Sequence, residues 1–115
     1  MKKVYHLGKC FTCKGILEEL NWSGEAQEIR SEKITEQQLD EMATLAGSYE
    51  ALFSRRAIKY KSMKLKEKTL SEADYRQLIL EEDTFLKRPV FLIDRSIFIG
   101  NTKKTIEAVQ AALNE

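Results

Sequence analysis

The stretch KKVYHLGKCFTCKGILEEL, residues 2–20, contains a β-type segment and a helical segment joined by a short turn. Valine and tyrosine favour strands, so residues 2–6 are predicted to form a strand that Gly8 ends. Isoleucine and leucine then recur at helical spacing, which predicts a helix over residues 11–22. Both cysteines of the chain are therefore predicted to lie where a strand turns into a helix.

Strand and helix periods alternate along the rest of the chain. The further predicted elements are, in chain order, a strand over residues 26–30, a helix over 35–46, a short helix over 49–53, a helix over 71–82, strands over 90–93 and 97–99, and a last helix that Asn101 or Thr102 caps. The helix over 35–46 opens with a capping-box pattern, because Gln38 follows Thr35 by three residues. Residues 54–68 are basic and have no clear period.

The order β-α-β, several helices and β-β-α predicts one thioredoxin-like α/β domain over residues 1–115. Its central sheet is expected to be mixed, with flanking helices on it. A chain of 115 residues has the commonest size of a single domain and can bury a core of its own. The several helices form a predicted insertion over roughly residues 35–84. The single proline, Pro89, stands immediately before the third strand.

The charge balance argues against a function based on a large electrostatic field. Nineteen basic and eighteen acidic side chains give a net charge near +1, so direct binding to nucleic acid or to an anionic membrane is not expected. No segment approaches the ~20 apolar residues of a membrane span, and no secretory leader is recognisable. The expected location is the cytoplasm. One histidine and two cysteines are too few for a zinc site, so no metal is expected.

Cys10 and Cys13 are the candidate reactive groups. A cysteine between a strand and a helix lies at the helix N-terminus, where free backbone N–H groups and the helix dipole favour a thiolate. Such a position lowers a thiol pKa from about 8.5 to roughly 3.5–7.5. Cys13 follows by three residues, one helical turn away, and is the natural resolving thiol. The alternative is two buried cysteines that act as small hydrophobic side chains.

Two neighbours of the cysteines are further candidates. His6 precedes Cys10 by four residues, and it either stabilises a thiolate or packs as an ordinary strand-end histidine. Lys14 follows Cys13 directly, and it either adds positive charge beside the thiol or points into solvent.

Three arginines are candidate oxyanion ligands, because a guanidinium group matches a tetrahedral oxyanion with two hydrogen bonds. They are Arg88, beside Pro89, and Arg55 and Arg56 in the basic segment. The alternative is that these side chains are solvated surface residues, as most arginines are. The bond before Pro89 is either cis or trans, and only about 5–6% of such bonds are cis in folded proteins.

Taken together, several motifs resemble those of the arsenate reductase family that includes the Spx regulators. The motifs are HLGKCFTCK at residues 6–14, LFSRRAIKY at 52–60, FLKRPVFLID at 85–94 and IFIGN at 97–101. The resemblance runs nearly end to end. It implies a thioredoxin-like sheet with a helical insertion and a cis bond between Arg88 and Pro89, next to the cysteine turn.

The resemblance also implies a chemistry for Cys10. In the reductases the matching cysteine attacks arsenate, glutathione and glutaredoxin then release arsenite, and arginines bind the oxyanion. His6 matches a histidine of the reductase pattern, whereas Lys14 stands where the reductases have an arginine. An arginine of the middle segment corresponds to Arg55 or Arg56.

Two other positions of the reductase pattern lie near the hairpin. Arg88 matches the arginine that precedes the proline, but Gly100 and Asn101 stand where a further arginine is expected. Spx-like regulators instead carry a C-x-x-C redox switch at the turn and bind the α subunit of RNA polymerase. Cys10 and Cys13 fit that switch.

Three hypotheses follow. The first is an arsenate reductase-like thiol oxidoreductase that acts on an oxyanion or a disulfide, with Cys10 as nucleophile and Cys13 as resolving thiol. It would hold no bound cofactor and would take electrons from glutathione, glutaredoxin or thioredoxin. The second is a redox-sensing transcriptional regulator that binds the RNA polymerase α subunit. The third is a structural thioredoxin-fold protein with idle thiols.

Overall fold

The computed structural model describes residues 2–7 and 11–114, and its description of side chains omits residues 11–13. The chain divides into two compact units, Met1–Lys33 with Arg88–Glu115, and Ile34–Lys87.

The first unit contains the sheet. Its elements are β1 (Lys2–His6), α1 (Phe11–Glu19), β2 (Glu25–Glu28), β3 (Val90–Ile93), β4 (Ser96–Ile99) and α5 (Lys103–Leu113). Among the described residues, four strands form one sheet in the order β2-β1-β3-β4. β1 runs parallel to β2 and antiparallel to β3, and β3 pairs with β4 as a hairpin. This mixed sheet confirms the predicted thioredoxin-like order of strands and helices.

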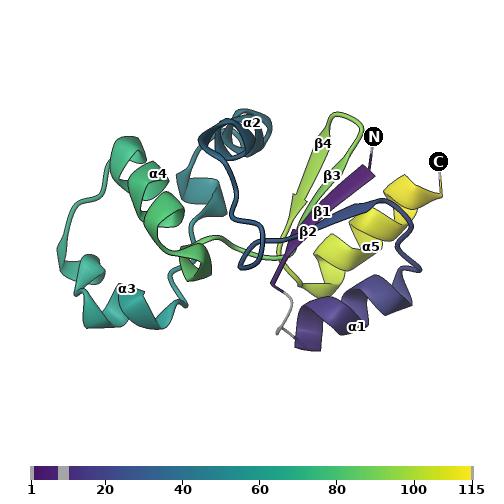
Figure 1. Ribbon diagram of the computed structural model, residues 1–115, viewed down its shortest axis with the longest axis horizontal. Helices are drawn as coiled ribbons and strands as arrows, with labels where there is room; N and C mark the ends of the chain where they lie inside the picture. The colour runs from purple at the N-terminus through teal and green to yellow at the C-terminus, as the bar shows by residue number, and fades with distance from the viewer. Residues whose placement is uncertain (1, 8–10, 115) are drawn as a thin grey trace. The chain divides into compact units, whose positions relative to one another are not determined.

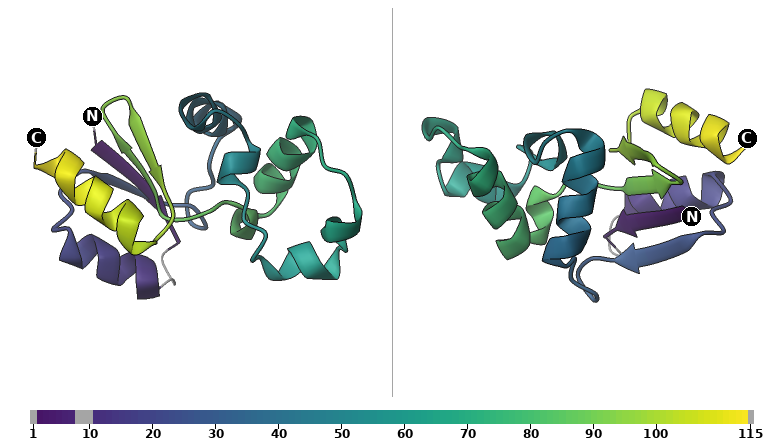
Figure 2. Two further views of the ribbon diagram at one scale, coloured as in Figure 1. Left: turned by 180° about the vertical axis from the view of Figure 1, so that it is seen from behind. Right: turned by 90° about the horizontal axis from the view of Figure 1, so that it is seen from above.

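One face of the sheet packs on the two helices of this unit. Val4, Phe91 and Ile93 point to that face, since they alternate with Tyr5 and Leu92 along their strands. They form a core cluster with side chains of α1 and α5, namely Ile16, Leu20 and Val109. Figures 1 and 2 show α1 and α5 side by side on the same side of the sheet. The whole of β3 is buried, which explains its uninterrupted apolar sequence.

Two predicted boundaries differ from the structure for local reasons. α1 ends at Glu19 rather than at residue 22, because Asn21 adopts a left-handed conformation with φ of 53°. The Trp22 N–H then donates to the carbonyl of Leu17 across the helix end (3.0 Å). β2 ends at Glu28 rather than at residue 30. The Glu28 carboxylate accepts hydrogen bonds from the backbone N–H groups of Arg30 and Ser31, and these bonds turn the chain.

The predicted caps are confirmed. Thr35 and Gln38 form the capping box of α2 (Glu36–Ala46), which ends at Gly47 with φ of 96°. A second capping box, from Ser71 and Asp74, opens α4 (Glu72–Glu81). At the last helix the structure decides between the two candidates, since the Thr102 side chain accepts from the backbone N–H of Thr105.

The second unit is helical. Besides α2 and α4 it contains α3 (Ile58–Ser62) and three short 3₁₀ helices, η1 (Glu50–Leu52), η2 (Leu65–Glu67) and η3 (Asp83–Phe85). Arg76 on α4 ties that helix to α2, because its Nε donates to Asp40 at 2.9 Å. Tyr49 donates to the same carboxylate. The hydrogen bond from Arg76 is the main reason why the pKa of Asp40 lies below its usual value.

The basic segment, residues 54–68, showed no clear period in the sequence. In the structure it contains α3 and η2.

No helix within residues 2–7 and 11–114 has the length and apolar character needed to cross a membrane.

Two glycines of the first unit should respond to alanine in opposite directions. A Cβ on Gly24 would lie 2.6 Å from the backbone oxygen of Lys2, so Gly24→Ala forces the start of β2 away from β1 and should lower the free energy of unfolding by about 1–3 kcal/mol. A Cβ on Gly15, within α1, meets nothing within 4 Å, so Gly15→Ala should raise the free energy of unfolding by about 0.5–1 kcal/mol. Denaturant unfolding measures both, and equal shifts would contradict the packing described for Gly24.

Candidate functional site

The connection from β1 to α1 has the predicted place in the sequence. α1 begins at Phe11, the residue that follows Cys10 in the sequence, and its backbone includes Cys13 in the first turn. Cys10 and the side chain of Cys13 lie outside the described residues. Their roles as nucleophile and resolving thiol therefore stay predictions.

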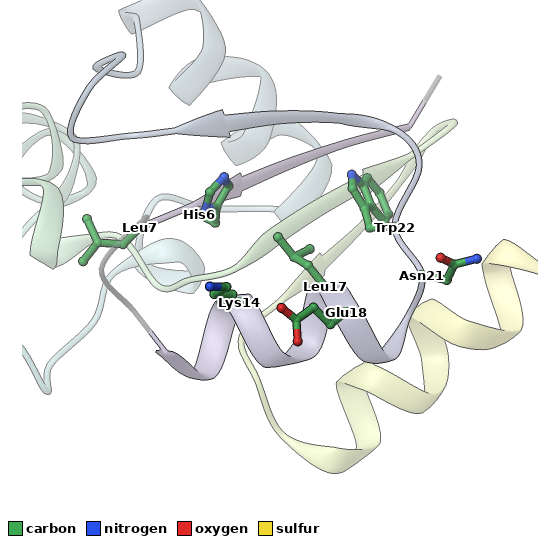
Figure 3. A pocket seen from close by; sticks show the side chains of 7 residues that line it. All are labelled: His6, Leu7, Lys14, Leu17, Glu18, Asn21 and Trp22. Atoms are coloured by element: carbon green, nitrogen blue, oxygen red, sulfur yellow. The ribbon is translucent and has the colours of Figure 1, made fainter.

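A pocket of about 650 Å³ opens between β1 and α1 beside this turn. It is lined by His6, Leu7, Lys14, Leu17, Glu18, Asn21 and Trp22. Figure 3 shows His6 on the strand side of this space and Leu17 pointing into it from the helix. His6 faces α1 because it lies two residues after Val4, on the same face of the sheet. Two of the predicted site residues, His6 and Lys14, thus line one pocket.

Sequence analysis did not identify the other lining residues. The helical spacing from Lys14 contained part of the signal, since Leu17 and Glu18 follow at three and four residues and share its face of α1. Asn21 lies beyond the end of the helix. Trp22 closes the far end, where its indole N–H donates to the carbonyl of Glu25 (3.1 Å) and its ring meets Phe91 edge-on (5.4 Å between centroids). The pocket thus combines an apolar wall with charged groups of both signs.

Arg88 and Pro89 lie directly before β3, at the end of the sheet where β1 ends with His6. The peptide bond between them is cis, as the family resemblance implied. β1 and β3 pair antiparallel with Tyr5 opposite Val90, and one further step in this register brings Pro89 opposite His6. The Pro89 carbonyl accepts a hydrogen bond from Gly100 (2.9 Å), and Arg88 is half-buried. The proline therefore lies at the end of the sheet where α1 begins.

Arg55 and Arg56 belong to the second unit. The Nη2 group of Arg55 donates to the Glu50 carboxylate at 2.8 Å and to the Tyr75 hydroxyl at 3.1 Å. Arg56 is exposed. Their predicted role as ligands of an oxyanion beside Cys10 stays a prediction.

Metal-binding groups are not gathered in the described part of the chain. No group of three or more histidine, cysteine, aspartate or glutamate side chains there has the proximity to hold a metal ion.

Comparisons with known proteins place the chain in a family. The search of curated protein sequences finds no match. Solved structures with a similar fold include the YffB (PA3664) protein, with a TM-score of 0.81, 20% identity and coverage of 98% of this chain and 99% of that one. An ArsC family related protein from Bacteroides fragilis has a TM-score of 0.77 at 24% identity, covering 94% and 96% of the two chains.

An arsenate reductase from Vibrio cholerae has a TM-score of 0.76 at 16% identity, and the match covers 96% of each chain. At these identities the structures show the fold, and the family follows from a different comparison. The ArsC family model matches residues 5–109, from the end of β1 into α5, so the protein belongs to the ArsC family.

Proposed function

We propose that the protein is a thiol oxidoreductase of the arsenate reductase type, acting on an oxyanion or a disulfide. The observation that carries the proposal is the start of α1 directly after Cys10, within the span that the ArsC family model matches. A helix N-terminus favours negative charge, both on a thiolate and on a bound oxyanion. The same position therefore suits the nucleophile and its substrate.

The proposed reaction balances with the two cysteines alone. The Cys10 thiolate attacks arsenic(V), an As–S bond forms, and one oxygen leaves as water. Cys13 then attacks the sulfur of Cys10, and the electron pair of the breaking As–S bond stays on arsenic, which leaves as arsenite. Two thiols have become one disulfide, and arsenic has gained two electrons. With a disulfide substrate, the first attack forms a mixed disulfide that Cys13 resolves.

The other residues are proposed to prepare the attack. His6 and Lys14 line the pocket beside the turn, where positive charge or a hydrogen bond stabilises a thiolate. Arg88, with Arg55 or Arg56, is proposed to bind the oxyanion, and Pro89 to border the substrate.

The disulfide must be reduced before the next turnover. Glutathione, glutaredoxin or thioredoxin is the proposed electron donor, and no bound cofactor is required. A low-molecular-weight thiol fits within a pocket of about 650 Å³, which supports a role for the small donor.

The decisive test is arsenite formation from arsenate in the presence of glutathione and glutaredoxin. The unmodified chain should turn over, Cys10→Ser should abolish activity, and Cys13→Ser should retain attack but release product more than tenfold more slowly. Trapping of the adduct by mass spectrometry separates the two steps. Activity that survives in Cys10→Ser, or no turnover of either arsenate or a model disulfide by the unmodified chain, would refute the proposal.

The charge of Lys14 should accelerate thiolate chemistry. Lys14→Gln should slow alkylation of Cys10 at pH 7 by about two- to fivefold, the effect expected of one nearby charge at a helix end. Lys2→Gln is the matched control, because Lys2 starts β1 and the length of the strand separates it from His6 at the far end. Equal rates of Cys10 alkylation in the unmodified chain and in Lys14→Gln would contradict a role of Lys14 in stabilising the thiolate.

A second candidate function is a redox-sensing regulator that binds the RNA polymerase α subunit. Lys14, Gly100 and Asn101 favour it, because they replace arginines of the reductase pattern while the dithiol is kept. In this case the Cys10–Cys13 disulfide changes a binding surface instead of completing a turnover. Purified α subunit should then bind one redox state at least tenfold more tightly than the other. The same weak binding with and without reductant would exclude this alternative.

A further inference from the structure

A recess of about 280 Å³ lies in the second unit and is lined by residues of that unit alone. Its apolar lining consists of Met63, Leu65, Leu70 and Leu78. Leu65 is buried and the other two leucines are half-buried, whereas 41% of Met63 is exposed. The recess therefore has a buried apolar base and an exposed methionine at its opening.

The recess forms where the chain returns from α3 to α4. α3 ends at Ser62, and Lys64 then adopts a left-handed conformation with φ of 54°, which turns the chain into η2. Figures 1 and 2 show the following segment as an open loop that returns to the start of α4. Leu78 follows Asp74 by four residues, so one face of α4 forms the opposite wall.

Positive charge surrounds this apolar recess. Residues 58–70 contain five lysines and one glutamate. Lys59 forms an ion pair with Glu82. The other four lysines are exposed and make no ion pair or side-chain hydrogen bond within the part of the chain that the structure describes; they are Lys61, Lys64, Lys66 and Lys68. Lys68 also lines the recess.

The acidic residue at the recess is already occupied. The Asp74 carboxylate accepts hydrogen bonds from the backbone N–H of Ser71 at 2.9 Å and from its hydroxyl at 3.0 Å. These bonds belong to the capping box of α4 and lower the pKa of Asp74. Asp74 is therefore held by the cap, and the lysines remain available for an acidic partner.

The size and shape of the recess restrict what it can bind. Pockets for whole small-molecule ligands have volumes of roughly 300–1,000 Å³, so this smaller recess suits an inserted side chain. A flat membrane surface does not fill a recess, and a phosphate backbone has no apolar side chain to insert. A second copy of the chain would oppose these lysines with its own, and like charges repel. An acidic segment of another protein has neither disadvantage.

We propose that the recess and the four unpaired lysines bind an acidic amphipathic helix of a partner protein. An apolar side chain of that helix enters between Met63 and Leu78, and its acidic side chains lie against Lys66 and Lys68. Met63 suits this role because its flexible side chain adapts to different apolar partners. The surface lies in the second unit, and the inference goes beyond the proposed thiol chemistry and does not depend on it.

The test titrates the full chain into a labelled helical peptide, about 15 residues long, with leucines on one face and glutamates on the other, and measures fluorescence anisotropy. The glutamate peptide should bind, and added salt should weaken binding because it screens the exposed lysines. A peptide with lysine in place of glutamate, and one with alanine in place of leucine, should each bind at least tenfold more weakly.

Two substitutions test the surface itself. Met63→Gln removes the apolar side chain at the opening without a change of charge, and it should weaken peptide binding about fivefold or more. Leu45→Gln is the matched control, because Leu45 is a similarly exposed apolar residue on α2 that does not line the recess. Thermal midpoints check that both variants are folded.

The charges have a test of their own, which alters exposed side chains only. The double variant Lys66→Gln and Lys68→Gln should weaken binding about tenfold and reduce its salt dependence. Lys103→Gln with Lys104→Gln removes two exposed lysines from α5 and should leave binding unchanged.

Several outcomes would overturn the proposal. They are no binding of the glutamate peptide, equal binding of the lysine peptide, and losses in the control variants as large as those at the recess. Sedimentation with phosphatidylglycerol vesicles tests a membrane as the occupant, and analytical ultracentrifugation tests a second copy. Vesicle binding or dimerisation that Met63→Gln abolishes would assign the surface to that occupant and refute the acidic helix.

Discussion

The antiparallel pairing of β1 with β3 is the constraint on which the first unit depends. It joins residues 2–5 to residues 90–93, which are far apart in the chain, and both strands occupy the centre of the sheet. Closing so long a loop costs conformational entropy, and the burial of the whole of β3 offsets that cost. Continued by one residue, the same register brings Pro89 opposite His6. The pairing that builds the core therefore also places two residues of the candidate site opposite each other.

Residues 34–87, within the loop that joins these strands, form a unit with hydrogen bonds and ring contacts of its own. Asp40 and Arg76 tie α2 to α4, and Phe53 packs among aromatic rings from later in the chain. This organisation explains how a basic segment without helical period still has a defined structure. Two of its basic side chains have specific partners: Arg55 contacts Glu50 and Tyr75, and Lys59 pairs with Glu82.

The candidate site of the first unit combines a general electrostatic feature with a specific shape. The helix N-terminus after Cys10 favours negative charge in any sequence. The pocket is particular to this chain, because Trp22 and Leu17 supply an apolar wall next to the cationic Lys14. Such a pocket suits a ligand with both apolar and charged parts.

The sequence by itself determined the strands, the helices α1, α2, α4 and α5 and the capping box of α2, because these depend on residues two to four positions apart. Thr35 with Gln38 and the strand-to-helix turn at the cysteines are local patterns of this kind. Tertiary structure decided which distant residues meet: the register that brings Pro89 opposite His6, the pocket wall from Leu17 to Trp22, and the partners of Arg55. Side chains from separate elements meet only after the chain has folded, so no local period encodes their contacts. For that reason two adjacent arginines were equivalent in the sequence and differ in the folded protein.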